Sequence, residues 1–110
     1  MGEPAEELEG RVVVITGASR GIGKGLALGL AAQGAAVVCA ARTEVEAPGG
    51  LPGTIHQTAA AITEAGGEAL AVRCDVGVEA DIEELIERTV GRFGRLDVLI
   101  NNAMAPTRGL

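Results

Sequence analysis

The stretch from Val12 to Gly23 constrains the fold more than any other part of this 110-residue chain. Four β-branched apolar residues at 12–15 lead into a glycine-rich turn, and a helical pattern starts directly after that turn. A buried strand, a tight turn and a helix in this order place the N–H groups of the helix N-terminus where they can bind an anion. The stretch therefore predicts an α/β fold with a nucleotide-type phosphate turn.

The composition agrees with a parallel sheet that is buried on both faces. Hydrophobic residues make up 47% of the chain, and Phe93 is its single aromatic residue. The core must therefore consist of Val, Ile, Leu and Ala, packed closely with the help of 17 glycines. Buried parallel strands are typically such β-branched apolar runs. At this length we expect one domain with a modest core.

The charge distribution excludes several classes of partner. The formal net charge is −6, Lys24 is the only lysine, and no Lys/Arg cluster occurs. Nucleic acid and anionic membrane surfaces are therefore excluded as general partners. The acidic N-terminus does not resemble a targeting signal, and the longest apolar stretch, 26–41, changes from a helical to a strand period. We expect a soluble, cytoplasmic protein.

Neither the cysteines nor the histidine forms a pattern typical of a reactive or metal site. Cys39 and Cys74 lie in apparent strands, which predicts buried thiols in a reducing compartment, with a disulfide or a catalytic thiol as the alternatives. His56 is the only histidine and no C-x-x-C pair occurs, so we expect no metal site. The carboxylates between 79 and 87 are interpreted as the solvated face of a helix.

The hydrophobic pattern predicts four strands that alternate with three helices. The expected strands are 11–16, 36–41, 68–73 and 96–100. The expected helices are 21–33, a second that starts at a Thr54/Gln57 capping box and ends at Gly66, and 79–93. Residues 1–10 form a flexible N-terminal segment, and 43–53 form a long loop rich in Pro and Gly. Such alternation gives a parallel sheet with right-handed crossovers.

The glycines of the opening stretch are spaced T-G-x-x-x-G-x-G rather than as the strict G-x-G-x-x-G fingerprint. Gly17 allows the chain to leave the strand sharply, Gly21 lets the backbone approach a pyrophosphate, and Gly23 lets the helix pack closely on the sheet. The Ser19 hydroxyl and the N–H groups around Ile22 can add hydrogen-bond donors. The alternative is a glycine-rich turn without a ligand.

Three motifs in order resemble the short-chain dehydrogenase/reductase family. They are the sequence TGASRGIG at 16–23, Asp75-Val76 after the third expected strand, and Asn-Asn-Ala at 101–103 after the fourth. The resemblance implies a Rossmann-type doubly wound parallel sheet with four strands in the order 3-2-1-4 and three helices. Residues 11–110 would then be the N-terminal half of an NAD(P)-binding domain, truncated before its later strands.

The resemblance also implies roles for residues after the third and fourth strands. Asp75 would accept a hydrogen bond from the adenine amino group, and Val76 would pack on the ring. Asn102 and Ala103 would line the ribose. Purely structural turn roles remain open for Asp75 and for the Asn-Asn pair. Met104 stands where the family usually has Gly, so its side chain would narrow the pocket there.

The residues after the second strand favour NADP(H) over NAD(H). An NAD site needs an acidic residue about 20 positions beyond the glycines to bind the ribose 2′-hydroxyl. This strand instead ends in Arg42, and no acid occurs before Glu44. Arg42 can bind a 2′-phosphate bidentately, and Arg20 matches the family's usual second basic contact. Alternatively, Arg42 is only a solvated arginine. Thr43 could contact the phosphate or cap the turn.

No catalytic residue of the family maps onto this chain. The family uses a Tyr-x-x-x-Lys pair with a Ser and an Asn, all after the fourth strand, whereas this chain has no tyrosine. Ser19 and Lys24, its only serine and lysine, belong to the glycine loop and the helix that follows. We therefore interpret the chain as the NADP(H)-binding part of a parent oxidoreductase, a homo-oligomer acting on a small carbonyl or alcohol substrate. The 110 residues alone should be inactive.

Two alternatives and one subgroup assignment remain at this point. The chain could instead be a non-catalytic dinucleotide-binding module, or an inert truncation product. The long loop followed by the sequence LPGTI at 51–55 resembles the hydroxysteroid dehydrogenase-like 2 subgroup. With its fourth strand as an apolar edge, the chain expressed alone should be poorly soluble or partly folded.

Overall fold

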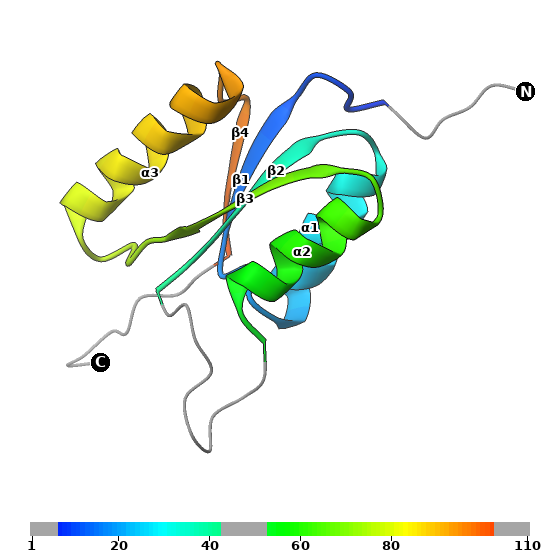
Figure 1. Cartoon of the computed structure of the whole chain (residues 1–110). Helices are drawn as coiled ribbons and strands as arrows, with labels where there is room; N and C mark the ends of the chain where they lie inside the picture. Colours follow the sequence, from blue (N-terminus) through cyan, green and yellow to red (C-terminus); the bar gives the residue numbers. More distant parts are fainter. Residues whose placement is uncertain (1–6, 43–52, 103–110) are drawn as a thin grey trace, which may run out of the picture.

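A computed structural model describes residues 7–42 and 53–102 of the chain (Figure 1). Strands and helices alternate from the first element to the last, as the hydrophobic pattern predicts. The strands are β1 Val12–Thr16, β2 Ala36–Ala41, β3 Glu68–Arg73 and β4 Val98–Asn101. The helices are α1 Gly21–Ala32, α2 Ile55–Glu64 and α3 Glu79–Phe93.

The four strands form one parallel sheet in the order β3-β2-β1-β4, which confirms the predicted fold class and strand order. Val14 of β1 lies beside Val38 of β2 on one side and Leu99 of β4 on the other. All residues of β1 and β2 are buried, because these two strands occupy the centre of the sheet. The sheet therefore carries its apolar β-branched runs in its interior strands.

The helices divide between the two faces of the sheet. In Figure 1, α1 and α2 lie together on one face and α3 lies on the other. Val13, Ile15 and Val37 point toward α1 and α2, where Ala27, Ile55 and Ile62 complete the first core cluster. On the opposite face, the second cluster contains Val14, Val38, Val72 and Leu85. Because alternate residues of β1 enter different clusters, this strand joins both halves of the core.

The helix ends follow from local chemistry that the sequence shows. At the start of α2, Gln57 N–H donates to Thr54 Oγ1 and Thr54 N–H donates to Gln57 Oε1, both at 3.1 Å. The predicted capping box is therefore confirmed. Gly94 follows α3 with φ +84°, and its N–H donates to the Val90 carbonyl at 2.7 Å. This left-handed backbone is readily adopted by glycine and ends the helix.

Some element boundaries differ from the prediction. The first strand starts at Val12 rather than residue 11, and α1 ends at Ala32, with Gln33 as its C-cap. The predicted strand 96–100 is wrong at both ends, because β4 spans Val98–Asn101. At its start, the Asp97 carboxylate rather than a backbone carbonyl accepts the Val12 N–H at 2.8 Å, so the regular ladder begins one residue later.

The structure also differs from the prediction at Cys74 and at residues 7–10. Cys74 follows β3 instead of lying within it, and its N–H donates to the Ala41 carbonyl at 2.9 Å. Residues 7–10, part of the expected flexible segment, form a turn in which Leu8 N–H donates to the Gln33 carbonyl at 2.9 Å. Leu8 also packs against the first core cluster. Within the described ranges, no helix is long and apolar enough to cross a membrane.

Candidate functional site

The predicted site residues gather at the edge of the sheet where the strands end. Because all four strands are parallel, their carboxyl ends lie at the same edge. Gly17 follows β1, Arg42 follows β2, and Asn102 follows β4. Asp75 lies two residues beyond the end of β3. Residues 103 and 104, together with Thr43, lie outside the described residues.

The turn after β1 requires glycine for two different reasons. Gly17 and Gly21 have φ values of +69° and +63°, a region that other residues seldom adopt. Gly23 instead lacks space: a Cβ there would overlap the Gly17 carbonyl oxygen and lie 2.7 Å from Asn102 Nδ2. The first turn of α1 therefore approaches the end of β1 more closely than any side chain would permit.

Neighbouring elements hold this turn from three sides. Ala18 N–H donates to the Ala40 carbonyl of β2 at 3.1 Å, and the Ala18 carbonyl accepts from Thr58 Oγ1 of α2 at 2.9 Å. After β4, Asn102 Nδ2 donates to the Gly17 carbonyl at 3.2 Å. Both backbone polar groups of Ala18 are thus satisfied inside the protein. The turn is a fixed structure before any ligand is considered.

The start of α1 has no side-chain cap. Its N-cap residue, Arg20, is fully extended at φ −163° and ψ 176°, and makes no capping hydrogen bond. The first turn also contains no acidic residue. The first N–H groups of a helix have no partner within the helix, and they carry the positive end of its dipole. In this chain those groups belong to the glycine loop, where Ile22 is 76% exposed.

Arg20 and Arg42 are both exposed near this edge. Within residues 7–42 and 53–102, no carboxylate lies within ion-pair distance of either guanidinium. Arg20 precedes α1 and Arg42 directly follows β2, which lies beside β1. The edge at which α1 begins therefore presents two exposed cations, an arrangement that suits an anionic ligand.

The segment after β3 forms a compact turn around Asp75. Gly77 N–H donates to Asp75 Oδ1 at 2.9 Å, and Val78 N–H donates to the Asp75 carbonyl at 2.9 Å. The Asp75 N–H donates to Asp81 Oδ2 at 3.0 Å. Asp75 and Val76 are both half-buried. The turn role left open for Asp75 is therefore present, and Oδ2 of this carboxylate can still accept another hydrogen bond.

Thr16 joins the ends of β1 and β4. Its hydroxyl donates to Asn101 Oδ1 at 2.8 Å and accepts from the Asn102 N–H at 3.0 Å. The structural role considered for the Asn-Asn pair is therefore also present. Because Asn102 at the same time holds the Gly17 carbonyl, these contacts connect the end of β4 directly to the glycine loop.

Two residues that contribute to this edge were missed in the sequence. Thr58 is fully buried and supports the glycine loop from α2. Its spacing from Ile55 and Ile62 places Thr58 on the inward face of α2. The sequence therefore indicated that Thr58 is buried, but not that it binds the Ala18 carbonyl. Asp81 was assigned to the solvated face of α3, yet its carboxylate contacts both Arg73 and Asp75. The available signal was Val78, directly before the predicted helix 79–93, because a valine side chain cannot cap a helix.

The two cysteines lack the character of nucleophiles. Both are buried and free, which confirms the prediction of buried thiols. Burial raises the pKa of the Cys39 thiol to about 12, and burial is also the main cause that raises the pKa of Cys74. Thiols with raised pKa values remain protonated at neutral pH and react slowly. The alternative of a catalytic thiol is therefore not supported.

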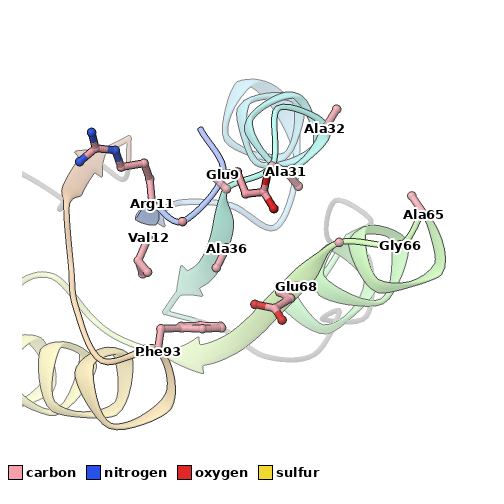
Figure 2. Close-up of a pocket in the computed structure, with 14 residues that line it drawn as sticks. Glu9, Arg11, Val12, Ala31, Ala32, Ala36, Ala65, Gly66, Glu68 and Phe93 are labelled. Carbon is pink, nitrogen blue, oxygen red and sulfur yellow. The ribbon is translucent and has the colours of Figure 1, made fainter. Parts of the chain in front are cut away.

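A cavity of about 570 Å³ lies at the opposite edge of the sheet. Figure 2 shows Glu9, Arg11, Glu68 and Phe93 among the side chains that surround it. Its lining includes residues at or next to the beginnings of β1, β2 and β3, whereas the candidate site follows the strand ends. The cavity is therefore separate from the phosphate-type turn.

The family of the chain follows from its match to known sequences. The sequence model for short chain dehydrogenases matches residues 11–109. The chain belongs to the short-chain dehydrogenase family. The matched range includes the glycine loop and the segments after β2, β3 and β4, and the family relationship implies a nicotinamide cofactor.

Relatives within the short-chain dehydrogenase family include hydroxysteroid dehydrogenase-like protein 2 from several vertebrates. The Danio rerio protein is 50% identical over 99 residues, which are 90% of this chain and 24% of that protein. The Homo sapiens protein is 47% identical over 98 residues, 89% of this chain and 23% of that protein. The predicted subgroup resemblance is confirmed, and the chain spans about a quarter of these relatives.

Solved structures of short-chain dehydrogenases have the same architecture. A short chain dehydrogenase from Mycobacterium thermoresistibile matches with a TM-score of 0.84 and 40% identity, over 94% of this chain and 36% of that one. A hydroxysteroid dehydrogenase from Escherichia coli matches with a TM-score of 0.81 and 31% identity, over 93% and 40% of the two chains. The sheet with its three helices is therefore a portion of this larger fold.

Proposed function

We propose that the carboxyl edge of the sheet binds NADP(H), as the cofactor-binding part of an oxidoreductase that acts on a carbonyl or alcohol substrate. The observation that carries this proposal is the uncapped start of α1 behind the glycine loop, with Arg20 and Arg42 exposed beside it. A helix N-terminus with no internal acceptor is suited to a phosphate group. Family membership supplies the class of ligand.

The glycine loop would hold the pyrophosphate. Its donors would be the N–H groups at Gly21, Ile22 and Gly23 and the hydroxyl of Ser19, while Gly17 keeps the backbone sharply turned. Hydrogen bonds from backbone N–H groups to a charged phosphate are stronger than those between neutral groups. This part of the site would bind NAD(H) and NADP(H) equally well, because both contain the pyrophosphate.

Arg20 and Arg42 would distinguish the two cofactors. A guanidinium can bind the 2′-phosphate of NADP(H) through two parallel hydrogen bonds. No acidic residue stands between Arg42 and Glu44 to bind the free 2′-hydroxyl of NAD(H) instead. We therefore propose NADP(H) as the preferred cofactor.

The ends of β3 and β4 would bind the adenosine. Asp75 would accept the adenine amino group, Val76 would contact the ring, and Asn102 with Ala103 would line the ribose. Asp75 keeps one carboxylate oxygen available for this contact because Gly77 N–H occupies the other. The bound cofactor would supply hydride chemistry at its nicotinamide, while the residues of this chain bind and orient its other half.

The proton donor for such a reaction is not among these 110 residues, since the chain contains no tyrosine. We propose that the parent protein supplies this group together with its substrate pocket, and that the parent is a cytoplasmic homo-oligomer. A second candidate is a non-catalytic module that binds NADP(H). Titration of the 110 residues with NADPH separates either function from an inert product, which would not bind.

The cofactor preference can be tested with Arg42→Ala. We expect NADPH affinity to fall about 10-fold to 100-fold, as loss of a charge-assisted contact predicts, while NADH affinity stays constant. Fluorescence titration of dilute protein with both nucleotides measures the ratio. Arg88→Ala removes the same charge from an exposed position on α3 and serves as the control. Equal affinity of the unmodified chain for NADH and NADPH, or an unchanged ratio in Arg42→Ala, contradicts the proposal.

A further inference from the structure

The first turn of α3 is organised by Asp81 rather than by a residue at its N-cap. The N-cap is Val78, whose side chain cannot accept a hydrogen bond, and no side-chain cap is present. Three residues later, Asp81 Oδ2 accepts the Asp75 N–H and also accepts from Arg73 Nη1, both at 3.0 Å. One carboxylate oxygen therefore joins the last residue of β3, the following turn and α3.

The contact between Asp81 and the backbone is the more important of these two. Arg73 has a side chain that is 49% exposed, so water screens its ion pair with Asp81 and the pair contributes little. The Asp81 side chain is 21% exposed, and it lies in the first turn of a helix, where a negative charge is favourable. The hydrogen bond from Asp75 N–H directs this charge toward the turn.

Asp75 is consequently fixed at three of its polar groups. Its N–H is held by Asp81, its carbonyl accepts from Val78 N–H, and its Oδ1 accepts from Gly77 N–H. A Cβ at Gly77 would lie only 3.3 Å from Asp75 Oδ1, so the turn is also compact. Together these contacts define the orientation of the carboxylate and leave Oδ2 to interact outside the turn.

We propose that Asp81 is a positioning residue that makes this site selective for adenine. It would hold the backbone of Asp75 so that the carboxylate meets the amino group of adenine and rejects hypoxanthine, which has a carbonyl oxygen at that position. The inference rests on the proposed function, because it assumes that Asp75 faces the base. It adds a residue on α3 that does not itself touch the nucleotide.

The test compares the binding of two ligands that differ at the base alone: adenosine 2′,5′-bisphosphate and inosine 2′,5′-bisphosphate. Isothermal titration is performed with the unmodified chain, Asp81→Ala, Asp81→Asn and the control Glu83→Ala, which removes an exposed charge from the same helix. We expect the unmodified chain to prefer adenine about 10-fold, as one additional hydrogen bond predicts. Asp81→Ala should reduce this preference to about twofold, because the Asp75 backbone loses its acceptor.

Asp81→Asn should retain most of the preference, since its amide oxygen can still accept the Asp75 N–H, and Glu83→Ala should retain all of it. If Asp81 has a purely structural role, Asp81→Ala should weaken the binding of both ligands equally. An unchanged ratio of the two affinities in folded Asp81→Ala therefore overturns the inference. If Asp81→Ala does not fold, Asp81→Ser gives the same comparison with a polar side chain too short to reach Asp75. A chain that binds both ligands equally overturns this inference alone, because the phosphate contacts of the proposed function are then still made. A chain that binds neither ligand overturns the proposed function and this inference with it.

Discussion

At the scale of single residues, Gly23 differs from the other glycines of α1. The absence of a Cβ at Gly23 allows the Gly17 carbonyl to lie against the helix, and this contact sets the shape of the turn. At Gly25, in the next turn of the same helix, a Cβ would meet nothing within 4 Å. The T-G-x-x-x-G-x-G spacing singles out Gly23 and not Gly25 in the sequence, and the surroundings of the two glycines differ in the same way.

We expect Gly23→Ala and Gly25→Ala to change stability in opposite directions. Gly23→Ala forces the turn away from α1 and should destabilise the chain by about 1–3 kcal/mol, with loss of the proposed NADP(H) binding. Gly25→Ala should stabilise it by about 0.5–1 kcal/mol, because alanine loses less backbone freedom in a helix. Chemical denaturation followed by circular dichroism measures both. A Gly23→Ala chain as stable as the unmodified one would contradict the close contact.

The sequence predicts the special residues of the glycine loop better than it predicts their supports. Gly17, Gly21 and Gly23 can be recognised because their spacing reflects backbone requirements that few other residues meet. Thr58 and Asp81 act through partners 40 and 6 residues away, and such pairs depend on how the helices pack. A single sequence does not show that Thr58 lies beside Ala18 or that Asp81 lies beside Asp75.

At the scale of elements, α2 acts as a support for the glycine loop. It reaches the loop through the fully buried Thr58, whose hydroxyl also lies 3.3 Å from the Thr54 carbonyl within its own helix. Thr63, further along α2, makes a similar contact to the Ala59 carbonyl at 3.0 Å but is exposed. The two threonines therefore provide a matched pair that differs in burial.

Thr58→Val should destabilise the chain by about 1–3 kcal/mol, since it leaves the Ala18 carbonyl without a buried donor while preserving the side-chain shape. Thr63→Val should change stability by less than about 0.5 kcal/mol, as expected for an exposed position. Thermal unfolding of the two variants measures the difference. Similar melting temperatures for both variants would show that the Ala18 contact has no energetic role.

The beginning of β4 depends on the charge of Asp97. Its carboxylate accepts from Arg95 at 2.7 Å and from the Val12 N–H at 2.8 Å, and these hydrogen bonds hold its pKa below the ordinary value of 3.8. A carboxyl group with a lowered folded-state pKa stabilises the fold when ionised. This contribution is fully present above pH 3.8 and is lost as the pH falls through the lower folded-state pKa.

We therefore expect Asp97→Asn to melt at a lower temperature than the unmodified chain at pH 7. The difference should shrink as the pH falls below 3.8, because the native carboxyl also becomes neutral. Thermal unfolding across this pH range is the measurement, with Glu87→Gln on the exposed face of α3 as the control. A difference that stays constant down to the lowest pH would exclude a role for the charge.

The same carboxylate explains why the boundary of β4 was predicted less well than the helices. The capping box of α2 and the amphipathic pattern of α3 are local signals, contained within a few residues. The start of β4 is instead decided by the contact between Asp97 and Val12, which is 85 residues away. Hydrophobicity at Leu96 suggested an earlier start because this residue packs into the second core cluster.

At the scale of the whole molecule, the two outermost strands of the sheet, β3 and β4, differ in character. β3 begins and ends with charged residues, Glu68 and Arg73, which discourage pairing with another strand. In β4, Val98 and Leu99 are 45% and 51% exposed, and among the described residues this strand pairs with β1 alone. The apolar edge predicted from the sequence is therefore present, whereas its effect on solubility stays a prediction.

We expect the 110-residue chain to self-associate through β4. Leu99→Lys places a charge on this strand and should shift the chain toward monomer, as charged residues do on natural sheet edges. Leu28→Lys, at an exposed position of α1, provides the control with the same change in charge. Sedimentation velocity at several concentrations measures the shift. A monomer that unfolds in one sharp transition without the substitution would contradict this expectation.

The overall topology could be predicted for two separate reasons. Alternation of strands and helices is visible in the hydrophobic periods, and it requires parallel pairing. The order of the strands came from the family resemblance carried by the glycine loop, Asp75-Val76 and the Asn-Asn pair. Periodicity alone places no strand beside another, because the order depends on which crossovers bring the apolar faces together.

The pairing of β1 with β4 also determines when the carboxyl edge of the sheet can be completed during synthesis. β1 and β2 are neighbours in the chain, but Asn102 reaches Gly17 across 85 residues. Closing so large a loop costs more entropy than closing the short connections within the first two strands, and non-local contacts form late. The ribosome must therefore release nearly the whole described sequence before the loop that begins at Gly17 acquires its last support.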